Sequence, residues 1–353
     1  MKTYEAIVIG GGQSGLAMGY YLRRKKVDFT ILDASPEAGG AWQEMWDSLH
    51  LFSPAEHNAL PGWWMPKSRN EYPNRDEVVD YLKKYEERYQ LPIDRPVEVE
   101  KVFKENDLFC LETNQGKYFS KAVVSATGTW TKPYIPAVPG YEKFQGEQLH
   151  TVDYKNPEPF KGKKVVIVGG GNSGAQILAE VSKVADTLWA VNGEPEFLPD
   201  EVDGHYLFQL ATQKYKAGNK DDNSPNYSLG SIVMVPSVKE AHERRVLKPV
   251  SMFSGFYEKG VYWEDGTREE ADAVIWCTGF KAALDHLEPL GIFDENNRIP
   301  TETTKVKDID GLWLVGYGQW TGFASATIIG VGRTARKTVL EVQDFLEKQS
   351  INS

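Results

Sequence analysis

The sequence predicts an α/β fold with two Rossmann-like domains. Two glycine-rich stretches, IGGGQSG at residues 9–15 and VGGGNSG at residues 168–174, each follow a short apolar run and precede a helical pattern. Two later stretches also match each other, VVSATGTW at residues 123–130 and VIWCTGF at residues 274–280. A chain of 353 residues has room for about two domains. The second half therefore repeats the plan of the first.

The first glycine stretch has the spacing GxGxxG between a strand and a helix. In that context Gly10 makes the tight turn, Gly12 lets the backbone approach a pyrophosphate, and Gly15 lets the helix pack on the strand. Gln13 and Ser14 open the helix, whose unpaired N–H groups face the phosphates. We therefore expect a dinucleotide at this turn.

The residues that follow complete the first site. The apolar run FTIL leads to Asp33, at the end of the second expected strand, where a carboxylate accepts hydrogen bonds from an adenosine ribose. In the stretch SPEAGGAW, Gly40 allows the backbone to approach a second phosphate or a flat ring, and Ala41 and Trp42 follow it.

The second glycine stretch gives the same roles to Gly169, Gly171 and Gly174, with Asn172 and Ser173 opening the helix. A single GxGxxG stretch is weak evidence, because glycine turns are common. Two copies in matching strand–turn–helix order are much stronger. The chain is therefore expected to bind two dinucleotides.

The remaining segments define the domains. Residues 72–91 carry apolar side chains at helical spacing, and residues 97–130 contain three strands around the turns ENDL and NQGK. A buried strand and a long helix within residues 311–349 return the chain to the first domain. We expect a discontinuous first domain made of residues 1–156 and 280–353. The second domain is expected to comprise residues 157–279 and to contain a polar loop near residues 213–230.

The composition describes an ordinary acidic globular protein. The net charge of -10 argues against nucleic acid or an anionic membrane as a partner. The chain has no long apolar run, and its start leads directly into a strand, so we expect no membrane span, no signal peptide and a cytoplasmic location. Cys110 and Cys277 form no CxxC pair, which argues against an unaided disulfide relay. The 6 histidines show no metal-ligand spacing, so no metal is expected.

A further stretch, FQGEQLHTVDY, places Phe144, Gly146, His150 and Tyr154 in the pattern FxGxxxHxxxY. Together with both glycine stretches and the stretches GGAW, YPNRDEV, SATGTW and WCTGF, this pattern resembles the flavin-containing monooxygenases, specifically their short bacterial CzcO-like branch. The resemblance covers nearly the whole chain.

The resemblance implies FAD in the first site and NADH and/or NADPH in the second. It implies an enzyme in which the nicotinamide reduces the flavin, O2 adds to flavin C4a, and the resulting hydroperoxide oxygenates a small organic substrate. That substrate is a sulfide or an amine, or a ketone by Baeyer–Villiger insertion. The cofactor supplies the difficult chemistry, and the protein orients it and excludes water. A homodimer is compatible with these features.

The motifs and the resemblance together give a set of site residues. The catalytic candidates are Phe52, His150 and Trp320. The cofactor-binding candidates are Gly10, Gly12, Gln13, Ser14, Gly15, Asp33, Gly40, Ala41, Trp42, His50, Val99, Ala126, Thr127, Gly128, Gln319, Thr327, Gly169, Gly171, Asn172, Ser173, Gly174, Asn192, Gly193, Cys277, Thr278 and Gly279. Thr327 is expected to add a donor where a helix N-terminus faces the flavin.

One position departs from the family pattern. Many relatives carry an asparagine where this chain has Phe52, in the stretch LHLFSP. A phenylalanine side chain cannot donate the hydrogen bond that helps to hold the hydroperoxide. We therefore expect more leakage to hydrogen peroxide.

The repeat also predicts the nicotinamide preference. The separation between Gly15 and Asp33, counted onward from Gly174, leads to Asn192, which Gly193 follows. An acid here would repel the 2′-phosphate of NADPH and an arginine would attract it, but neither residue is charged. We expect weak discrimination that leans to NADH. The alternative is that basic side chains from loops distant in the sequence bind that phosphate; these are Lys214, Lys216, Arg244 and Arg245.

Two other functions stay open. A reductase that passes electrons to a carrier, or to O2 without oxygenation, would share both nucleotide sites but would not need the FxGxxxHxxxY stretch. A non-catalytic redox sensor would have little use for a second nicotinamide site.

Overall fold

The computed structural model describes residues 3–200, 202, 204, 206–207, 209, 230–322 and 324–352. The chain forms two compact units; the first comprises Met1–Gln43, Pro54–Thr131 and Ala282–Ser353, and the second comprises Glu44–Ser53 and Lys132–Lys281. These boundaries differ from the expected 156/157 and 279/280. Residues 147–150 form a strand in the sheet of the second unit, which is why this unit includes residues before 157. The expected polar loop near 213–230 lies, up to residue 229, outside the described residues.

The first unit is built on a nine-stranded sheet. Its strands are β1 (Thr3–Ile9), β2 (Phe29–Leu32), β5 (Ile93–Asp94), β6 (Val99–Glu105), β7 (Leu108–Thr113), β8 (Gly116–Ser125), β17 (Thr301–Glu302), β18 (Lys305–Val306) and β19 (Leu312–Leu314). The main path runs β17-β18-β19-β8-β1-β2-β5, and the five strands from β19 to β5 are parallel. The three strands expected around ENDL and NQGK are confirmed as β6, β7 and β8.

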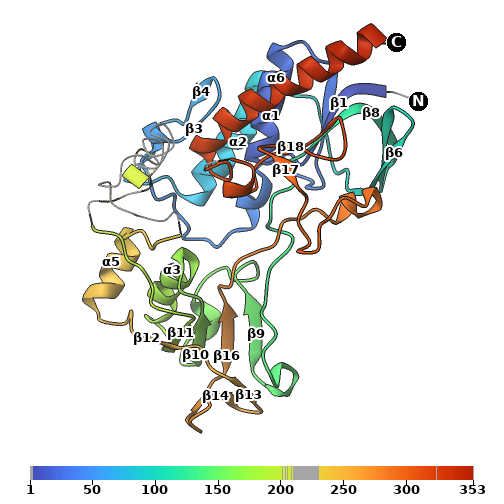
Figure 1. The fold of residues 1–353 in the computed structure, drawn as a ribbon. Helices are drawn as coiled ribbons and strands as arrows, with labels where there is room; N and C mark the ends of the chain where they lie inside the picture. Colours follow the sequence, from blue (N-terminus) through green and yellow to red (C-terminus); the bar gives the residue numbers. More distant parts are fainter. Residues whose placement is uncertain are drawn as a thin grey trace, which may run out of the picture. The chain divides into compact units, whose positions relative to one another are not determined.

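In the part of this unit that the structure describes there are three helices, α1 (Gln13–Arg24), α2 (Arg75–Tyr89) and α6 (Ile328–Asn352). Figure 1 shows the C-terminal helix α6, in red, lying along α1, in blue. The expected helix within residues 72–91 is confirmed as α2. It begins at a capping box, in which Glu77 N–H donates to Asn74 Oδ1 over 2.9 Å and Asn74 N–H donates to Glu77 Oε2 over 3.0 Å.

Short elements connect these parts of the first unit. They are the hairpin β3 (Ala59–Leu60) and β4 (Trp63–Trp64), and the 3₁₀ turns η1 (Gly40–Glu44), η2 (Ala55–His57), η5 (Asp285–Leu290) and η6 (Gly318–Trp320), of which η1 runs across the boundary after residue 43.

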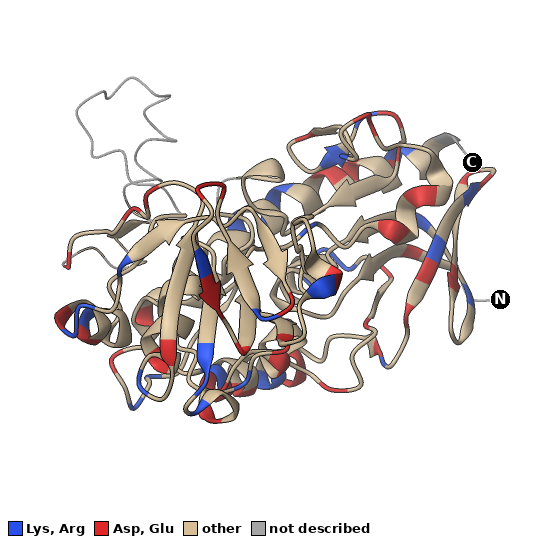
Figure 2. Cartoon of the chain, turned by 90° about the horizontal axis from the view of Figure 1, so that it is seen from below, with Lys and Arg blue, Asp and Glu red and all other residues tan. Residues whose placement is uncertain are grey.

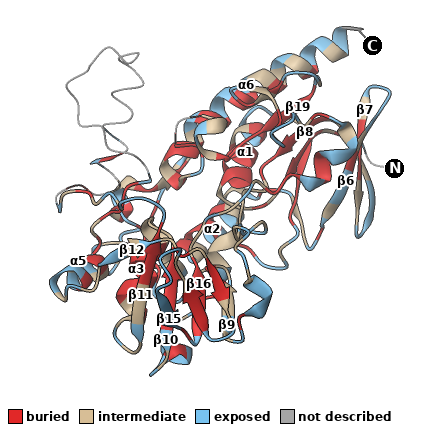
Figure 3. Cartoon of the chain, turned by 60° about the horizontal axis from the view of Figure 1, so that its bottom comes forward, coloured by how far each residue is buried: buried red, intermediate tan, exposed pale blue. Residues whose placement is uncertain are grey.

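The second unit contains a parallel sheet in the order β12-β11-β10-β16-β9 and a small antiparallel sheet. The strands are β9 (Glu147–His150), β10 (Lys164–Val168), β11 (Asp186–Val191), β12 (Pro249–Ser251), β13 (Gly255–Tyr257), β14 (Gly260–Tyr262), β15 (Arg268–Glu270) and β16 (Ala273–Trp276). Among its described elements are the helices α3 (Asn172–Val181) and α5 (Pro236–Glu243) and the 3₁₀ turns η3 (Tyr141–Lys143) and η4 (Glu158–Phe160). Figure 3 shows buried residues along β10 and β16, the central strands, which explains their continuous apolar sequence.

Figure 2 shows acidic and basic residues interspersed on the elements that carry them. Of the helices that the structure describes, none combines the length and the apolar character needed to cross a membrane.

Candidate functional site

The first glycine turn connects β1 to α1. Gly10 has a φ of 105°, and a Cβ at this position would lie 2.6 Å from the carbonyl oxygen of Ala126. A Cβ on Gly15 would overlap the carbonyl oxygen of Gly10. Gly12 differs, because its φ is -76° and a Cβ there would meet none of the described atoms within 4 Å. The protein's own backbone thus requires glycine at the first and third positions, whereas Gly12 borders open space that a ligand can enter.

The second glycine turn connects β10 to α3 and has the same geometry. Gly169 has a φ of 130°, and a Cβ there would overlap the carbonyl oxygen of Cys277. A Cβ on Gly174 would overlap the Gly169 carbonyl oxygen, and a Cβ on Gly171 would meet nothing described within 4 Å. At the described starts of α1 and α3 there is neither a side-chain cap nor an acidic residue in the first turn. Their N–H groups and positive dipole ends are therefore available to a pyrophosphate.

The two repeats differ in length by one residue between the glycine turn and the next strand. Gly10 N–H donates to the Leu32 carbonyl over 2.8 Å, and Gly169 N–H donates to the Ala190 carbonyl over 2.9 Å. These bonds make Leu32 and Ala190 equivalent, although Ala190 lies one position nearer to its glycine along the chain than Leu32 does. Equivalent positions in the two repeats therefore cannot be found by counting the same number of residues from each glycine turn, because the second repeat is one residue shorter.

This difference of one residue changes which residue of the second unit is equivalent to Asp33. In the first unit a Cβ on Gly11 would overlap Asp33 Oδ2, so the Asp33 carboxylate lies against the turn. In the second unit a Cβ on Gly170 would lie 3.5 Å from Cγ1 of Val191. Val191, and not Asn192, is thus the counterpart of Asp33. Asn192 is the next residue and is exposed.

An ion-pair cluster beside the first turn was missed by the sequence analysis. Arg95 Nε donates to Asp33 Oδ2 over 2.6 Å, and its terminal nitrogens Nη1 and Nη2 donate to the two carboxylate oxygens of Glu86 over 3.0 and 2.9 Å. Burial opposes the charge on Arg95, but the hydrogen bonds to Glu86 and Asp33 outweigh it and raise the pKa of the guanidinium. Arg95 lies 62 residues from Asp33, so no local motif could reveal the pair.

Gln13 joins three segments of the first unit. Its Nε2 donates to the carbonyl of Ala326 over 2.6 Å, and its Oε1 accepts the indole N–H of Trp42 over 3.1 Å. A Cβ on Gly40, whose φ is 55°, would lie 2.8 Å from Gly12 Cα. The expected residues Gln13, Gly40 and Trp42 are therefore brought together at the glycine turn, and the half-buried Ala41 lies between the last two in η1.

Thr327 precedes the first residue of α6. Its hydroxyl donates to the Ala324 carbonyl over 2.8 Å and accepts the Gly330 N–H over 3.0 Å. The hydroxyl hydrogen is therefore used within the turn, and Thr327 acts as a helix cap. This role differs from that of a hydrogen-bond donor to a ligand, which we expected from the sequence. Donors toward a ligand at this helix start must come from the backbone.

A buried hydrogen-bond network holds the turn after β8. Tyr317 Oη lies 3.0 Å from Ser125 Oγ and 2.7 Å from Thr127 Oγ1, and it accepts the Thr127 N–H over 3.2 Å. Ser125 Oγ also lies 3.1 Å from Nε2 of His286. Burial lowers the pKa of His286 to about 4 and raises the pKa of Tyr317. The expected residues Ala126, Thr127 and Gly128 thus sit on a rigid support.

His150 also has a structural environment. Its Nε2 donates to the Gly279 carbonyl over 3.0 Å, and its Nδ1 accepts the Val152 N–H over 3.3 Å. Burial lowers its pKa, which favours the neutral ring with this tautomer. Because both ring nitrogens are used, His150 holds the turn after β16 in place and is not poised for the proton transfer that a catalytic role requires.

The other residues of the FxGxxxHxxxY stretch also stabilise the second unit. The Phe144 ring packs against Phe256 with a centroid distance of 5.4 Å, and a Cβ on Gly146 would overlap the Phe144 ring. The Tyr154 hydroxyl donates to Glu180 over 2.8 Å. The stretch therefore fastens β9 and its continuation to the sheet and to α3.

The remaining residues of the second turn differ in their roles. The Asn172 side chain is hydrogen-bonded to the backbone of residues 231 and 233. Its Nδ2 donates to the Ser231 carbonyl over 3.0 Å, and its Oδ1 accepts the Val233 N–H over 2.9 Å. Thr278 donates to the Tyr134 carbonyl. Ser173 is half-buried in the first turn of α3, and Gly193 has a φ of 86° with open space at its Cα.

Phe52 and His50 lie in the second unit, not in the first unit with the expected FAD residues. The Phe52 side chain is 38% exposed, and its carbonyl accepts the Gly204 N–H over 2.7 Å. His50 Nδ1 donates to the Ser48 carbonyl over 2.7 Å.

Trp320, Gln319 and Val99 lie in the first unit. The Trp320 ring packs 5.7 Å from the Tyr317 ring and under the Arg298 guanidinium, whereas Gln319 is exposed. Val99 opens β6 and packs on the core. The residue that approaches Asp33 is instead Val97, whose N–H donates to the Asp33 carbonyl over 2.8 Å.

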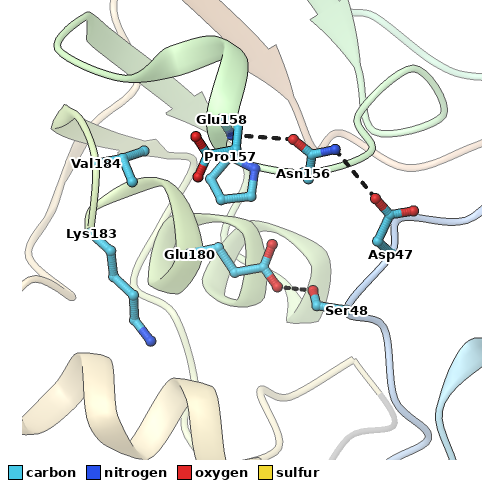
Figure 4. Close-up of a pocket in the computed structure, with 8 residues that line it drawn as sticks. All are labelled: Asp47, Ser48, Asn156, Pro157, Glu158, Glu180, Lys183 and Val184. Atoms are coloured by element: carbon cyan, nitrogen blue, oxygen red, sulfur yellow. Dashed lines mark hydrogen bonds between the residues drawn. The ribbon is translucent and has the colours of Figure 1, made fainter.

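A surface hollow of about 340 Å³ lies in the second unit at the C-terminal end of α3. Figure 4 shows Glu180 bonded to Ser48 and Asn156 placed between Asp47 and Glu158. Since the glycine turn is at the opposite end of α3, this hollow is separate from the nucleotide turn. Within the residues that the structure describes, no group of three or more His, Cys, Asp or Glu side chains could hold a metal ion.

Comparisons with known proteins agree with this geometry. Residues 7–207 match the family model described as pyridine nucleotide-disulphide oxidoreductase. An uncharacterized CzcO-like oxidoreductase of Geobacillus kaustophilus is 32% identical over 345 residues, which cover 96% of this chain and 98% of that protein.

Two solved structures are informative. A flavin-containing monooxygenase from Stenotrophomonas maltophilia is 45% identical with a TM-score of 0.90, and the match covers 98% of this chain and 99% of the other. A bacillithiol disulfide reductase from Staphylococcus aureus is 19% identical with a TM-score of 0.73 over 97% of this chain and 99% of the other. At that identity the second likeness shows the fold alone.

Proposed function

Because this chain belongs to the pyridine nucleotide-disulphide oxidoreductase family and is similar to a flavin monooxygenase along nearly its whole length, we propose that it is a flavoprotein monooxygenase with FAD in the first unit and NAD(P)H in the second. When bound, FAD accepts a hydride from the nicotinamide and activates O2. The proposed substrate is a small sulfide or amine, or a ketone.

The observation that carries the proposal is the duplicated glycine turn. In both units the outer glycines are confined by backbone, and the middle glycine faces open space at an uncapped helix start. A pyrophosphate needs this combination, since it must approach the backbone closely and its charge is stabilised by helix N–H groups. The residues of both turns therefore fit a dinucleotide.

The chain's own residues would hold FAD in stated ways. Asp33 would accept hydrogen bonds from the adenosine ribose, and the start of α1 would bind the pyrophosphate. The start of α6, which Thr327 caps, would direct its positive dipole end at the flavin. Gln13 and Trp42 would fix the packing of the ring near the turn.

Disulfide chemistry is disfavoured by the two cysteines. Cys110 is buried in β7 of the first unit, and Cys277 lies in the second unit after β16; both are free thiols. Burial raises the pKa of Cys277 to about 12, so its thiolate is scarce at neutral pH. A dithiol relay of the type that the family name describes would need a second thiol at the site.

The second candidate function is a reductase or oxidase that passes electrons to a carrier, or to O2 with formation of hydrogen peroxide, without oxygenating a substrate. The resemblance gives a reason for this second candidate, because many members of that family carry an asparagine at the position of Phe52, whose side chain offers no hydrogen bond. The two candidates share both nucleotide sites and differ only in whether oxygen reaches a substrate.

The experiment that separates them uses labelled oxygen. The purified holoprotein would be supplied with NADH or NADPH, ¹⁸O2 and an aryl methyl sulfide, and the sulfoxide would be analysed by mass spectrometry. Incorporation of one ¹⁸O atom into an enantiomerically enriched sulfoxide supports the monooxygenase. Complete recovery of the consumed oxygen as hydrogen peroxide, with no labelled product from sulfide, amine or ketone, would support the oxidase. Catalase separates the enzyme's product from oxidation by free peroxide.

A further inference from the structure

Arg95 occupies a place that neither the motifs nor the comparisons assign. It follows β5 and reaches back to the glycine turn, where a Cβ on Gly11 would lie 2.9 Å from Arg95 Nη2. Its side chain is 13% exposed, and the side chains of its partners Asp33 and Glu86 are 9% and 16% exposed. The cluster is therefore largely withdrawn from water and borders the position where the adenosine ribose would lie.

The hydrogen bonds leave the guanidinium little freedom. Its Nε–H is used by Asp33 Oδ2 over 2.6 Å, while Nη1 and Nη2 form a two-point contact with Glu86. A guanidinium held by a fork on one side cannot rotate without breaking both bonds. Glu86 on α2 thus fixes Arg95, and Arg95 in turn fixes one oxygen of Asp33.

Fixing Oδ2 determines what the other oxygen can do. The terminal torsion of an aspartate is broad, so an unrestrained carboxylate samples many orientations. Here Oδ2 faces Arg95 and Gly11, and Oδ1 accepts the Ser35 N–H over 3.5 Å, a long contact that leaves acceptor capacity for a ligand. A pre-oriented acceptor binds a hydroxyl with less loss of entropy.

We propose that Arg95 is a positioning residue for the adenosine end of the first dinucleotide, acting through Asp33 so that Oδ1 accepts the ribose hydroxyls. This inference rests on the proposed function, since it takes FAD as the dinucleotide of the first unit. It assigns Glu86 a supporting role, because Glu86 holds the guanidinium in the orientation that Asp33 needs.

The test measures FAD binding and requires no turnover. Apoprotein would be titrated with FAD, with FMN and with an FAD analogue that carries 2′-deoxyadenosine, and binding would be followed by flavin fluorescence. The variants are Arg95→Lys, Asp33→Asn and the pair combined. Arg95→Lys keeps a positive charge between the two carboxylates but cannot reproduce the fork. Lys84→Gln on the same helix α2 is the matched control, since it breaks an exposed ion pair with Asp80.

We expect Arg95→Lys to weaken FAD binding about tenfold, and to weaken it less than about twofold when Asp33 is already asparagine. The effect should shrink for the 2′-deoxyadenosine analogue and vanish for FMN, which lacks adenosine. Lys84→Gln should bind FAD like the parent. A purely structural role for Arg95 predicts an equal loss in the Asp33→Asn background and an equal loss for FMN, and either result would overturn the inference.

A second variant tests the inference if Arg95→Lys does not fold. If circular dichroism shows that Arg95→Lys does not fold, Arg95→Gln with Glu86→Gln removes both charges and keeps amide hydrogen bonds; the same weakening for FAD and the same indifference for FMN are expected. Failure of the parent to bind FAD would overturn the proposed function itself. Tight FAD binding by the parent, without coupling between Arg95 and Asp33, would overturn only this inference.

Discussion

The phenol oxygen of Tyr317 accepts the backbone N–H of Thr127 over 3.2 Å and lies 2.7 Å from the hydroxyl of the same residue. This relationship ties the chain after β19 to the chain after β8, at the end of the sheet where the first glycine turn also lies. Ser125 and His286 extend the network, and both are buried. The turn after β8, where we expect the nucleotide, is thus supported by buried side chains from other segments of the first unit.

Tyr317→Phe should therefore lower the free energy of unfolding. The substitution keeps the ring but leaves the Thr127 N–H without its acceptor, which costs about 1–3 kcal/mol for a buried group. Urea unfolding of the apoprotein would measure the change. Tyr141→Phe, at a tyrosine that is 37% exposed, serves as the matched control and should change the free energy by less than about 0.5 kcal/mol. Equal stability of Tyr317→Phe and the parent would show that the network is not stabilising.

His286 should make the first unit sensitive to acid. Burial lowers its pKa from 6.5 to about 4, so folding favours the neutral ring. The stability it contributes is present above pH 6.5 and is lost as the pH falls toward 4; between pH 7 and pH 5 the loss is about 2 kcal/mol. His286→Gln can bond Ser125 without titrating and should flatten this part of the stability profile. The exposed His242→Gln should leave the profile unchanged, and an unchanged slope in His286→Gln would contradict the assignment.

The fold was largely predictable because its signals are local. The strand–turn–helix order around each glycine stretch, the helical spacing of apolar residues within 72–91 and the strands around ENDL and NQGK all depend on neighbouring residues. The unit boundaries depend on distant pairing. β9 joins β16 across more than a hundred residues, and no property of the sequence near residue 147 specifies that partner.

The two middle glycines give a paired prediction. Gly12→Val should displace FAD and leave the fold intact, because φ is -76° and a side chain would extend into open space. Gly171→Val, with φ of -104°, should weaken NADH and NADPH binding in the same way while FAD is retained. Absorbance of the purified proteins reports FAD, and anaerobic titration reports the nicotinamide. Full FAD content in Gly12→Val would contradict the assignment of the first site.

The candidate site was predictable where backbone geometry defines it and not where side chains converge. The six glycines of the turns lie as the GxGxxG pattern requires. Arg95 and Tyr317 reach the site from other segments, so their roles follow from packing alone. His150, the histidine of the FxGxxxHxxxY pattern, is named as a catalytic candidate from the sequence, but both of its ring nitrogens are hydrogen-bonded in this structure, which favours a structural role.

The register of the second unit leads to a last prediction, which concerns nicotinamide preference. Val191 stands where Asp33 stands in the first unit, so the residue at this position does not repel the 2′-phosphate of NADPH. Of the basic residues named as alternatives, Arg244 is hydrogen-bonded elsewhere, since its Nη1 and Nη2 donate to Ser182 and Ala179 near the far end of α3. Lys214 and Lys216 lie outside the described residues, and Arg245 is exposed. We therefore expect comparable kcat/KM values for NADH and NADPH.

Two pairs of substitutions test that register. Val191→Asp should disfavour NADPH by about tenfold through charge repulsion, whereas the neutral Val191→Asn, of the same shape, should not. Asn192→Arg should favour NADPH by a similar factor, because a guanidinium can pair with the phosphate. The opposite result is that Asn192→Asp excludes NADPH while Val191→Asp and Val191→Asn behave alike. That result would show that Asn192, the residue reached by counting directly from Gly174, is the one beside the ribose. A parent preference for NADPH of about a hundredfold, or about 2.7 kcal/mol in transition-state terms, would mean that a basic residue reads the phosphate after all. Steady-state kinetics with both cofactors, measured for the parent and all four variants, decides between these outcomes.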